Sequence, residues 1–437
     1  MGLLLIKRCS CTEGGVCLKN GKIHYAWIIL IVTFLSVLIA AVTNTMSGVM
    51  MIPFEKEFGW SRASISGAFA VCITLVGFSG PFIAGLYQKF NVRSVLLIGM
   101  GALLVAVLLT TIMTQIWHLF IIWGVMIGLS AGTFLTVLNA YVATTWFEKK
   151  RGLALGLLTS SSAAGQLVFL PLMAYIVENY SWRSAVLTIF SFGVFVYVLL
   201  WIFMKSDPSD VGVLPLGAEH SNKKQVNNIN PVKAAFDGLK LGAKSKVFWL
   251  LAGSFFVCGF STSGLIGTHF ISLCMDYGYK EVTAASILAF MGIFNIIGTT
   301  LSGYISDRFD NRWLLFWYYG LRGLSLLILP FALSTNSLIY LSAFAIFYGM
   351  DWIATVPPTI KLATDHFGKE KVGVIYGWIY TAHQLGAGAA AYGGGLIYSW
   401  LNAYQSIFIA AGIFCLVATL FVLNIKRKAV LNQDLTA

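Results

Sequence analysis

The stretch Arg308-Phe309-Asp310-Asn311-Arg312 repeats the pattern of Lys89-Phe90-Asn91-Val92-Arg93, which lies 219 residues earlier in the chain. Three other loop motifs recur in the same order 218 to 220 residues apart: Phe147-Glu148-Lys149 with Phe367-Gly368-Lys369, Tyr180-Ser181-Trp182 with Tyr398-Ser399-Trp400, and Phe58-Gly59-Trp60 with Tyr277-Gly278-Tyr279. Four motifs in one order and at nearly one offset indicate two copies of a single unit. A duplicated apolar unit is typical of secondary transporters, whose substrate site lies between the copies.

The residues between these motifs are mostly apolar. The 437-residue chain is 58% hydrophobic and 11% charged, whereas a soluble protein carries about 25% charged residues. A helix of about 20 apolar residues spans the hydrocarbon core of a bilayer. Twelve runs reach this length, at 25–51, 63–87, 94–113, 116–144, 153–177, 184–204, 247–274, 282–306, 313–333, 337–363, 372–398 and 402–425. We therefore predict an all-α integral membrane protein with twelve transmembrane helices in two six-helix pseudo-symmetric bundles.

The basic residues lie in alternate loops between the predicted spans. The loops around Lys89, Lys149 and Arg308, the stretch 205–246 and both ends of the chain are rich in Lys and Arg. The intervening loops contain only Lys56, Arg62, Arg183 and Lys280. Because cytoplasmic loops are enriched in Lys and Arg, we predict a multi-pass protein with both termini cytoplasmic, in a bacterial inner membrane. The net charge of +12 then requires no nucleic-acid partner, and the lipid bilayer is the expected partner.

One polar stretch, 205–245, interrupts the apolar pattern and is predicted to link the two halves. It is rich in Pro, Asn and Lys, as linkers are, and its residues 232–244 form an amphipathic stretch suited to a membrane surface. The predicted domains are a cytosolic tail at 1–24, bundles at 25–204 and 246–425, this cytosolic linker, and a cytosolic tail at 426–437. Two interpretations stay open for Cys9, Cys11 and Cys17 in the first tail: free thiols, or a metal-binding or redox-sensing site.

The segment from Gly303 through Asp307 and Arg308 to Arg312 resembles the signature loop of the major facilitator superfamily. In that signature, an Asp follows a Gly by four residues and basic residues follow the Asp. An Asp at a helix end pairs with basic groups or with a facing helix N-terminus, and so holds two halves together until they rock apart. The resemblance predicts a cytoplasmic gate made of Lys89, Arg93, Asp307, Arg308 and Arg312. Gln88 takes the Asp position in the first copy, which predicts a weaker first lock, and interfacial charge anchoring is the alternative.

Further loops are similar to the branch of that family that contains monocarboxylate transporters and oxalate–formate antiporters. These loops are Trp146 to Gly156, His24 to Trp27, Phe58 to Arg62, Tyr180 to Arg183 and Phe294 to Gly298. The resemblance covers nearly the whole chain, and it implies alternating access to a central site between two bundles. Carriers of this branch commonly have an Arg directly after Phe-Asn-x-x-Gly, where a guanidinium holds the anion. This chain has Thr299 there, so either another cation holds the anion or the substrate differs.

Arg322, Asp351 and His383 lie well inside their predicted spans, and Lys361 lies near the cytoplasmic end of the tenth. An ionisable residue within the membrane is a functional-site candidate by default. Arg322 and Asp351 either pair to offset a costly burial or form a coupling pair that opens to receive a proton or an anion. His383 either hydrogen-bonds within the interior or, when protonated, offers a cation to an anionic substrate.

The remaining candidates for the substrate site are amides and a hydroxyl. Together with His383, the expected substrate-binding residues are Asn139, Gln166, Asn295, Thr299 and Gln384. Such side chains either hydrogen-bond a polar substrate or satisfy the polar groups of neighbouring helices, and both interpretations stay open.

The sequence lacks the motifs of other function classes. It contains no phosphate-binding Walker loop, no metal-ligand cluster of convincing spacing and no nucleophile–base motif. We therefore expect neither an enzyme nor a cofactor, and a substrate or ion gradient as the energy source. The expected function is secondary active transport of a small organic anion, a mono- or dicarboxylate, by a monomer that couples to a proton or exchanges substrates. The alternative is uptake or efflux of a larger polar or amphipathic compound, such as a drug or a siderophore.

Overall fold

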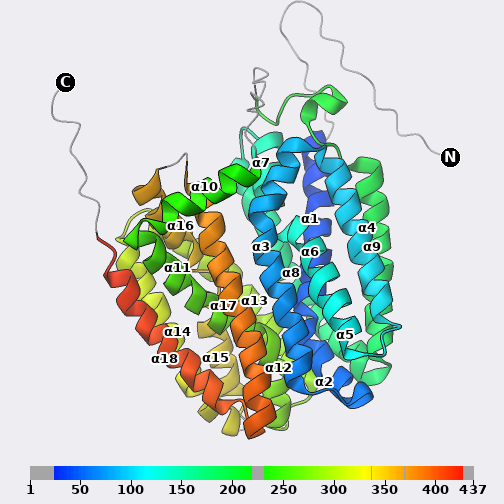
Figure 1. Ribbon diagram of the computed structural model, residues 1–437, viewed down its shortest axis with the longest axis vertical. Helices are drawn as coiled ribbons and strands as arrows, with labels where there is room; N and C mark the ends of the chain where they lie inside the picture. Colours follow the sequence, from blue (N-terminus) through cyan, green and yellow to red (C-terminus); the bar gives the residue numbers. More distant parts are fainter. Residues whose placement is uncertain (1–23, 219–230, 336, 369–370, 427–437) are drawn as a thin grey trace, which may run out of the picture.

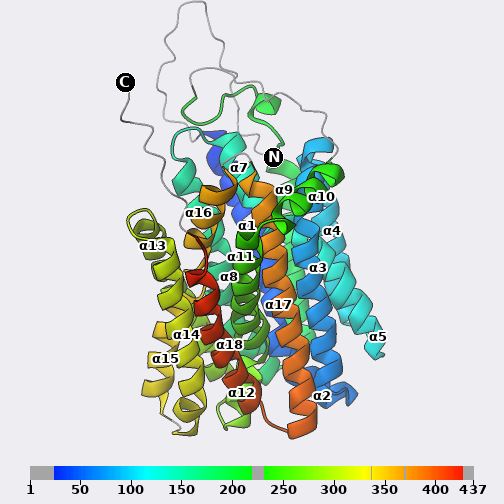
Figure 2. The same cartoon turned by 60° about the vertical axis from the view of Figure 1, so that its left-hand side comes forward.

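The computed structural model describes residues 24–218, 231–335, 337–368 and 371–426. These residues are almost entirely helical, and the one isolated β-bridge among them joins Phe147 to Leu216. The helices form two bundles that stand side by side, one from each half of the chain (Figure 1 and Figure 2). The predicted all-α architecture of two bundles is thereby confirmed. Cys9, Cys11 and Cys17 lie outside the described residues.

The first bundle combines continuous helices with segmented ones. Its continuous helices are α3 (Arg62–Lys89), α4 (Val92–Thr110), α8 (Arg151–Asn179) and α9 (Trp182–Phe203). Its segmented spans are α1 (Tyr25–Thr45) with α2 (Ser47–Phe58), and α5 (Ile116–Leu119), η1 (Phe120–Ile127), α6 (Gly128–Leu135) and α7 (Leu138–Trp146). The η1 segment is π-helical, a form that interrupts helices at functional positions more often than elsewhere.

The second bundle is built in the same way. Its continuous helices are α13 (Glu281–Ser306), α14 (Asn311–Ser334), α17 (Val372–Leu401) and α18 (Gln405–Leu423). Its segmented spans are α11 (Lys246–Gly259), η3 (Phe260–Ile266) and α12 (Gly267–Asp276), and α15 (Leu338–Asp351) with α16 (Val356–Phe367). The duplication is visible in the backbone, because Gly59 and Gly278 of the repeated loop both adopt a left-handed conformation, with φ of 68° and 87°.

Within the described residues, eleven helical segments are long and apolar enough to cross a membrane. They correspond to eleven of the twelve predicted spans. The remaining span is α17, whose many glycines and whose His383-Gln384 pair make it less apolar. It is nevertheless 30 residues long, about 45 Å at a rise of 1.5 Å per residue, and so it has the length of a transmembrane helix.

The tenth predicted span is interrupted at residues 352–355, between α15 and α16. Pro357 and Pro358 lie in the first turn of α16, where a proline is tolerated because its missing N–H would have no partner in the helix. The two prolines predict a kink in this helix, and the interruption that the structure contains lies just before them.

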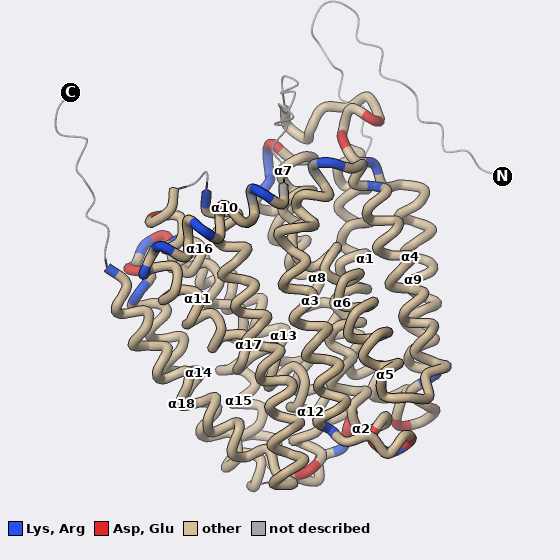
Figure 3. The backbone as a smooth tube through the Cα atoms, in the orientation of Figure 1, with Lys and Arg blue, Asp and Glu red and all other residues tan. Residues whose placement is uncertain are grey.

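The two ends of the molecule differ in charge (Figure 3). One end, where α7, α16 and α10 (Pro231–Ala243) lie, gathers most of the described Lys and Arg residues, and we name it the basic face. The last turn of α3, the loops before α8 and α14, and the first turn of α14 contribute Lys89, Lys149, Arg308 and Arg312. The other end carries α2 and the loop at residues 277–280, and we name it the opposite face. This separation of charge matches the alternation of basic loops along the sequence.

The described part of the linker packs against both bundles at the basic face. The Leu216 amide donates to the Trp146 carbonyl over 2.8 Å, which joins the linker to the loop before α8. Helix α10 (Pro231–Ala243) then lies across α3 and α17 (Figure 1). Its Phe236 ring contacts Phe82 of α3, and its Ala235 carbonyl accepts a 2.9 Å hydrogen bond from Trp378 of α17. The amphipathic stretch is therefore a helix that bridges the two bundles.

Candidate functional site: a central cavity

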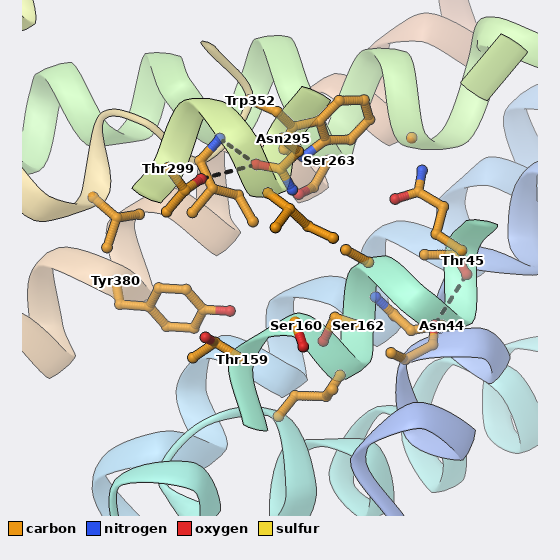
Figure 4. A pocket seen from close by; sticks show the side chains of 18 of the residues that line it. Asn44, Thr45, Thr159, Ser160, Ser162, Ser263, Asn295, Thr299, Trp352 and Tyr380 are labelled. Atoms are coloured by element: carbon orange, nitrogen blue, oxygen red, sulfur yellow. Dashed lines mark hydrogen bonds between the residues drawn. The ribbon is translucent and has the colours of Figure 1, made fainter. Parts of the chain in front are cut away.

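A cavity of about 700 Å³ lies between the two bundles (Figure 4). Most of its lining comes from α1 and α8 of the first bundle and from α12, α13, α16 and α17 of the second, with single contributions from α2, α6 and η3, two residues of α3, and two of the interruption before α16. This volume lies within the range of about 300–1,000 Å³ that is usual for small-molecule sites. The walls contain four of the six predicted substrate-site residues: Gln166, Asn295, Thr299 and Gln384.

The cavity extends toward the basic face. Gly152 in the first turn of α8, Gly303 in the last turn of α13 and Ile360 of α16 all line it. These helix ends lie at the basic face, whereas Asn44 and Thr268 line the cavity deeper in the molecule. In this conformation the solute path is therefore open at the basic face.

One polar wall of the cavity is organised around Asn295 on α13. Its Oδ1 accepts hydrogen bonds from the Thr299 hydroxyl at 3.1 Å and from the Ile353 amide at 3.2 Å (Figure 4). Asn295 thus holds the interruption between α15 and α16 against α13, and places Trp352 and Ile353 in the cavity wall. Its amide nitrogen has no hydrogen-bond partner among the described residues and is left for a solute or for water.

The facing wall comes from α1 and α8 and is rich in hydroxyls. Thr159 and Ser160 donate to carbonyls of their own helix, at 3.0 Å and 2.8 Å, and so offer mainly oxygen lone pairs to the cavity. Ser162 and Gln166 also line the cavity, and neither has a hydrogen-bond partner among the described residues. A polar group without a partner is expensive unless water or a solute satisfies it, so these two side chains are the strongest donors on this wall.

Tyr380 of α17 projects into the space between the two walls (Figure 4). Its ring stacks on the His383 imidazole, with centroids 5.7 Å apart and an interplanar angle of 6°. The hydroxyl has no partner among the described residues, and a phenol O–H is a good donor to an anionic or carbonyl oxygen. Tyr380 is not among the predicted site residues, because nothing in its sequence neighbourhood distinguishes it from the other tyrosines of α17.

The cavity lining is electrically neutral. None of the described residues that line it is Asp, Glu, Lys, Arg or His. The walls instead present hydroxyls, amides, the Tyr380 phenol and the Trp352 indole, between apolar surfaces. Such a lining binds polar groups by hydrogen bonds but supplies no full charge to neutralise an ion.

Two predicted substrate-site residues lie behind the cavity wall. Asn139 donates to the Leu158 carbonyl at 3.4 Å and holds α7 against α8, and its buried Oδ1 has no partner among the described residues. His383 faces α11, where its ring contacts Phe255, and its Nδ1 lies 3.0 Å from Oε1 of Gln384. His383 therefore contacts the cavity through its neighbours Gln384 and Tyr380.

Arg322 and Asp351 form the pair that the sequence suggests, away from the cavity lining. The Arg322 Nε lies 2.5 Å from Asp351 Oδ2, and the two residues are 1% and 6% exposed. The guanidinium also donates to the Asp351 carbonyl at 2.5 Å and to the Cys258 sulfur at 2.9 Å. It thereby caps the C-terminal end of α15, where a cation is favourable.

The predicted gate residues of the second bundle remain within their own bundle. Asp307 forms an ion pair with Lys361 of α16 at 3.6 Å. The Arg308 guanidinium lies 4.0 Å from the Tyr304 ring, and Arg312 pairs with Asp310 at 2.6 Å.

The predicted gate residues of the first bundle are separate from these. Arg93 donates to the Trp201 carbonyl at 2.6 Å, and Lys89 lies 5.5 Å from the Phe90 ring. No ion pair among the described residues joins the two signature loops, which agrees with a cavity that opens at this face.

The opposite face is closed by a cluster that we name the opposite-face lock, made of Arg62, Glu55, Asp276 and Tyr398. Arg62 of α3 pairs with Glu55 at 2.9 Å and with Asp276 of α12 at 3.3 Å, and its guanidinium carbon lies 3.7 Å from the Tyr398 ring centroid. This role cannot be read from the sequence alone, although Arg62 is one of the few basic residues in that set of loops.

Close packing of α3 against α17 completes the closure. A Cβ on Gly395 would lie 1.9 Å from the Ser66 hydroxyl and 2.6 Å from the Arg62 carbonyl. A Cβ on Gly388 would lie 3.1 Å from the Ala70 carbonyl. The glycines of α17 therefore allow close helix contact at this face.

Comparison with known proteins agrees with this architecture. The sequence model of the Major Facilitator Superfamily matches residues 33–391. The uncharacterized MFS-type transporter YcxA of Bacillus subtilis (strain 168) is 24% identical over 397 residues, covering 89% of this chain and 92% of the relative. Monocarboxylate transporter 12-B of Danio rerio is 24% identical over 451 residues, covering 96% of this chain and 91% of the relative.

Solved structures share the same fold. A D-xylose-proton symporter superposes with a TM-score of 0.69 at 14% identity, covering 92% of this chain and 98% of the other. A bacterial homologue of the human lysosomal transporter Spinster, in an inward-facing and unoccupied conformation, gives a TM-score of 0.68 at 14% identity, covering 92% and 97%. The family's sequence model matches most of the chain, and the structure contains the two duplicated helical bundles around a central cavity. This chain therefore belongs to the Major Facilitator Superfamily.

Proposed function

We propose that this protein is a secondary transporter that carries a small organic acid, a mono- or dicarboxylate, across the membrane by alternating access. The observation that carries the proposal is the neutral cavity of about 700 Å³, which reaches one face and is sealed from the other by the opposite-face lock. Relatives that are named as monocarboxylate transporters support the choice of substrate class.

The neutral lining constrains how such an acid is carried. A carboxylate that leaves water needs a compensating charge or a proton, because burial of an uncompensated anion is costly. The described cavity lining supplies hydrogen-bond donors but no cation. We therefore propose that the acid moves together with a proton, or that one acid exchanges for another, so that no net charge crosses on the substrate.

The direction of opening rests on a second part of the proposal. Because basic loops favour the cytoplasmic side of a membrane, we propose that the basic face is cytoplasmic and that this conformation is open to the cytoplasm. A single chain supplies every wall of the cavity, which supports the monomer as the transporting unit.

An uncharged amphipathic compound is the second candidate substrate. The absence of charge among the described lining residues favours it, and the cavity has room for a molecule larger than a simple carboxylate. Import and export of such a compound use the same walls, and so the lining does not select a direction.

Uptake into reconstituted vesicles tests the proposal. Purified protein in vesicles should take up radiolabelled L-lactate or oxalate saturably, and faster when an inward proton gradient or internal substrate is imposed. Gln166→Leu should weaken uptake because it removes a partnerless amide from the wall, whereas Asn179→Ala, at the exposed end of α8, should leave uptake unchanged. No saturable uptake of any mono- or dicarboxylate by the wild-type protein would overturn the choice of substrate.

A further inference from the structure

A buried polar cluster lies beside the cavity, and none of its residues is part of the cavity lining. It contains Arg322 of α14, Asp351 of α15, Cys258 of α11 and His383 of α17, so four helices of the second bundle meet in it. We propose that Asp351 binds the proton that this transporter moves, with Arg322 as its partner. The inference rests on the transport function proposed above and adds the site of coupling.

The geometry of the pair is not that of a fully satisfied structural ion pair. Such a pair commonly places two parallel guanidinium N–H groups on both carboxylate oxygens. Here a single Arg322 N–H reaches Oδ2 of Asp351, and Nη2 instead donates to the Asp351 and Trp352 carbonyls. The other carboxylate oxygen, Oδ1, is buried and has no partner among the described residues. That oxygen is free to accept a proton.

Arg322 keeps other partners when Asp351 is neutral. Its Nη2 donates to the Asp351 carbonyl at 2.5 Å and to the Trp352 carbonyl at 3.3 Å, and its Nη1 donates to the Cys258 sulfur at 2.9 Å. These carbonyls form the C-terminal end of α15, which carries partial negative charge. When Asp351 is protonated, Arg322 therefore still has hydrogen-bond acceptors. This matters because a buried cation without a partner strongly destabilises a protein.

A chain of contacts leads from the cavity to this cluster. Gln384 lines the cavity, and its Oε1 lies 3.0 Å from Nδ1 of His383. His383 contacts the Cys258 thiol, which in turn contacts the Arg322 guanidinium. The Cys258 sulfur also lies 3.2 Å from the Thr355 hydroxyl, in the interruption before α16. His383 and Cys258 are therefore the titratable groups between the cavity lining and the Arg322–Asp351 pair, and His383 is the one that exchanges a proton with the cavity side, since the guanidinium keeps its own protons.

Other titratable groups also face the cluster. They are Tyr318 and Tyr319 on α14, Tyr348 on α15, Tyr376 on α17 and Cys415 on α18. Tyr348 is engaged by its hydroxyl, which donates to the Ser261 carbonyl at 2.8 Å. The Tyr319 hydroxyl is also buried without a partner among the described residues, but it already carries its proton. Asp351 is the one carboxylate of this set and has the closest contact with the guanidinium, which distinguishes it as the proton acceptor.

Protonation has a direct structural consequence for the cavity. When Oδ1 gains a proton, an O–H bond forms, the carboxylate loses its charge, and the hydrogen bond from Arg322 to Oδ2 weakens. Arg322 also holds the carbonyls at the end of α15, and the adjoining residues Trp352 and Ile353 line the cavity. A change in the hydrogen bonds of Arg322 therefore shifts Trp352 and Ile353 in the cavity wall. Proton binding at Asp351 and substrate binding in the cavity are thereby coupled through the interruption between α15 and α16.

Infrared spectroscopy tests the proton site without any substrate. The difference spectrum of the purified protein between about pH 8 and about pH 5 should contain the C=O stretch of a buried, protonated carboxyl. Glu281 is a second buried carboxylate with an unpartnered oxygen, at the start of α13, and would add a band of its own. The spectra are therefore recorded in the Glu281→Gln background, where Asp351→Asn should abolish the remaining band. A missing band in Glu281→Gln, or a band that persists when Asp351→Asn is added to it, would overturn the proposal.

Vesicles with a trapped pH indicator test the coupling itself. We expect wild-type protein to carry protons inward with L-lactate, and Asp351→Asn to lose both this proton flux and accumulation above equilibrium. Exchange of labelled for unlabelled lactate requires no net proton movement and should persist. If Asp351→Asn does not fold, the double variant Arg322→Gln with Asp351→Asn removes the buried charge and makes the same predictions.

Several outcomes separate the two proposals. Lactate-driven proton flux equal to that of the wild type in Asp351→Asn would overturn the coupling site. Failure of the wild type to move any carboxylate would instead overturn the proposed substrate, while the infrared experiment would still decide whether Asp351 takes up a proton. His383→Gln should slow proton entry relative to lactate exchange, as a relay residue would.

Discussion

Arg62 of α3 and Asp276 at the end of α12 lie 3.3 Å apart across the boundary between the two bundles. They are 214 residues apart in sequence, and Arg62 is largely buried, with 8% of its side chain exposed. Tyr398 of α17 stacks on the same guanidinium, so three helices from both halves converge on one cation. Alternating access requires the opposite face to open, and that opening must break this contact.

Removal of the Asp276 charge is predicted to favour the conformation that is open at the opposite face. Asp276→Asn should lose about 1–3 kcal/mol of stabilisation that exists only in the closed state, because hydrogen bonds to charged groups have about this value. Hydrogen exchange measured by mass spectrometry should then speed up in α2 and in residues 277–280. Lys280→Ala is the control, since Lys280 is exposed on the same loop. Unchanged exchange in α2 would mean that Arg62 and Asp276 do not hold this face closed.

Gly395→Ala is also predicted to favour the conformation that is open at the opposite face, through steric overlap instead of a change in charge. The added methyl group would lie within 2.6 Å of the Arg62 carbonyl and within 1.9 Å of the Ser66 hydroxyl. Overpacking of this kind typically costs about 1–3 kcal/mol, and the cost applies only where α3 and α17 touch.

The control for Gly395→Ala is Gly373→Ala on the same helix. A Cβ at Gly373 would meet nothing within 4 Å, so this variant should gain slightly from the better helix propensity of Ala. The rate of hydrogen exchange in the first turns of α3 is the measurement for both variants. Equal exchange rates in the two variants would show that the α3–α17 contact does not resist opening.

A third prediction concerns pH and the loop pair at Glu57. Its carboxylate lies 2.6 Å from Arg183 and accepts a hydrogen bond from the Trp182 indole at 2.5 Å. The hydrogen bond from Arg183 lowers the pKa of Glu57 below its usual 4.5. A lowered folded-state pKa contributes stability that is present above the unfolded pKa and is lost as the pH falls through the folded pKa.

Glu57→Gln should therefore lower the melting temperature at about pH 7 and have little effect at about pH 3. The loss should stay below about 1 kcal/mol, because both side chains are more than a third exposed and solvent screens the pair. Thermal unfolding followed by tryptophan fluorescence at the two pH values is the measurement. A loss of the same size at acidic pH would assign the effect to packing against Trp182 instead of to the charge.

The sequence predicts the spans well and the orientation of their side chains poorly. Runs of about 20 apolar residues identify membrane helices because the bilayer fixes their length, and the repeated loops relate the two halves. The rotation of each helix depends on its neighbours. His383 and Gln384 are adjacent, yet successive residues of an α-helix point about 100° apart, so that Gln384 reaches the cavity and His383 faces α11.

Interruptions and interhelical partners also escape prediction from sequence. The break at residues 352–355 depends on Arg322 and Asn295, which come from two other helices and hold its carbonyls and amides. From the sequence, Arg62 looks like any basic residue that anchors a helix end at the membrane surface. Its role becomes visible only in the structure, because its partner Asp276 belongs to the other half of the chain. The Arg322–Asp351 pair is easier to propose, since two opposite charges in an apolar environment require each other.

The last prediction restores a guanidinium at the position where related carboxylate carriers commonly have one. Thr299 lines the cavity beside Asn295 and donates to it at 3.1 Å. Thr299→Arg should place a fixed cation in a cavity whose described lining has none, and so increase the affinity for oxalate by about tenfold or more, at a cost in stability from the lost hydrogen bond. Thr299→Gln adds length without charge and is the control, and a thermal-shift titration with oxalate measures both. Equal affinity of the arginine and glutamine variants for oxalate would show that the lack of charge in the cavity lining does not limit anion binding. A proton would then not be needed to neutralise the bound carboxylate.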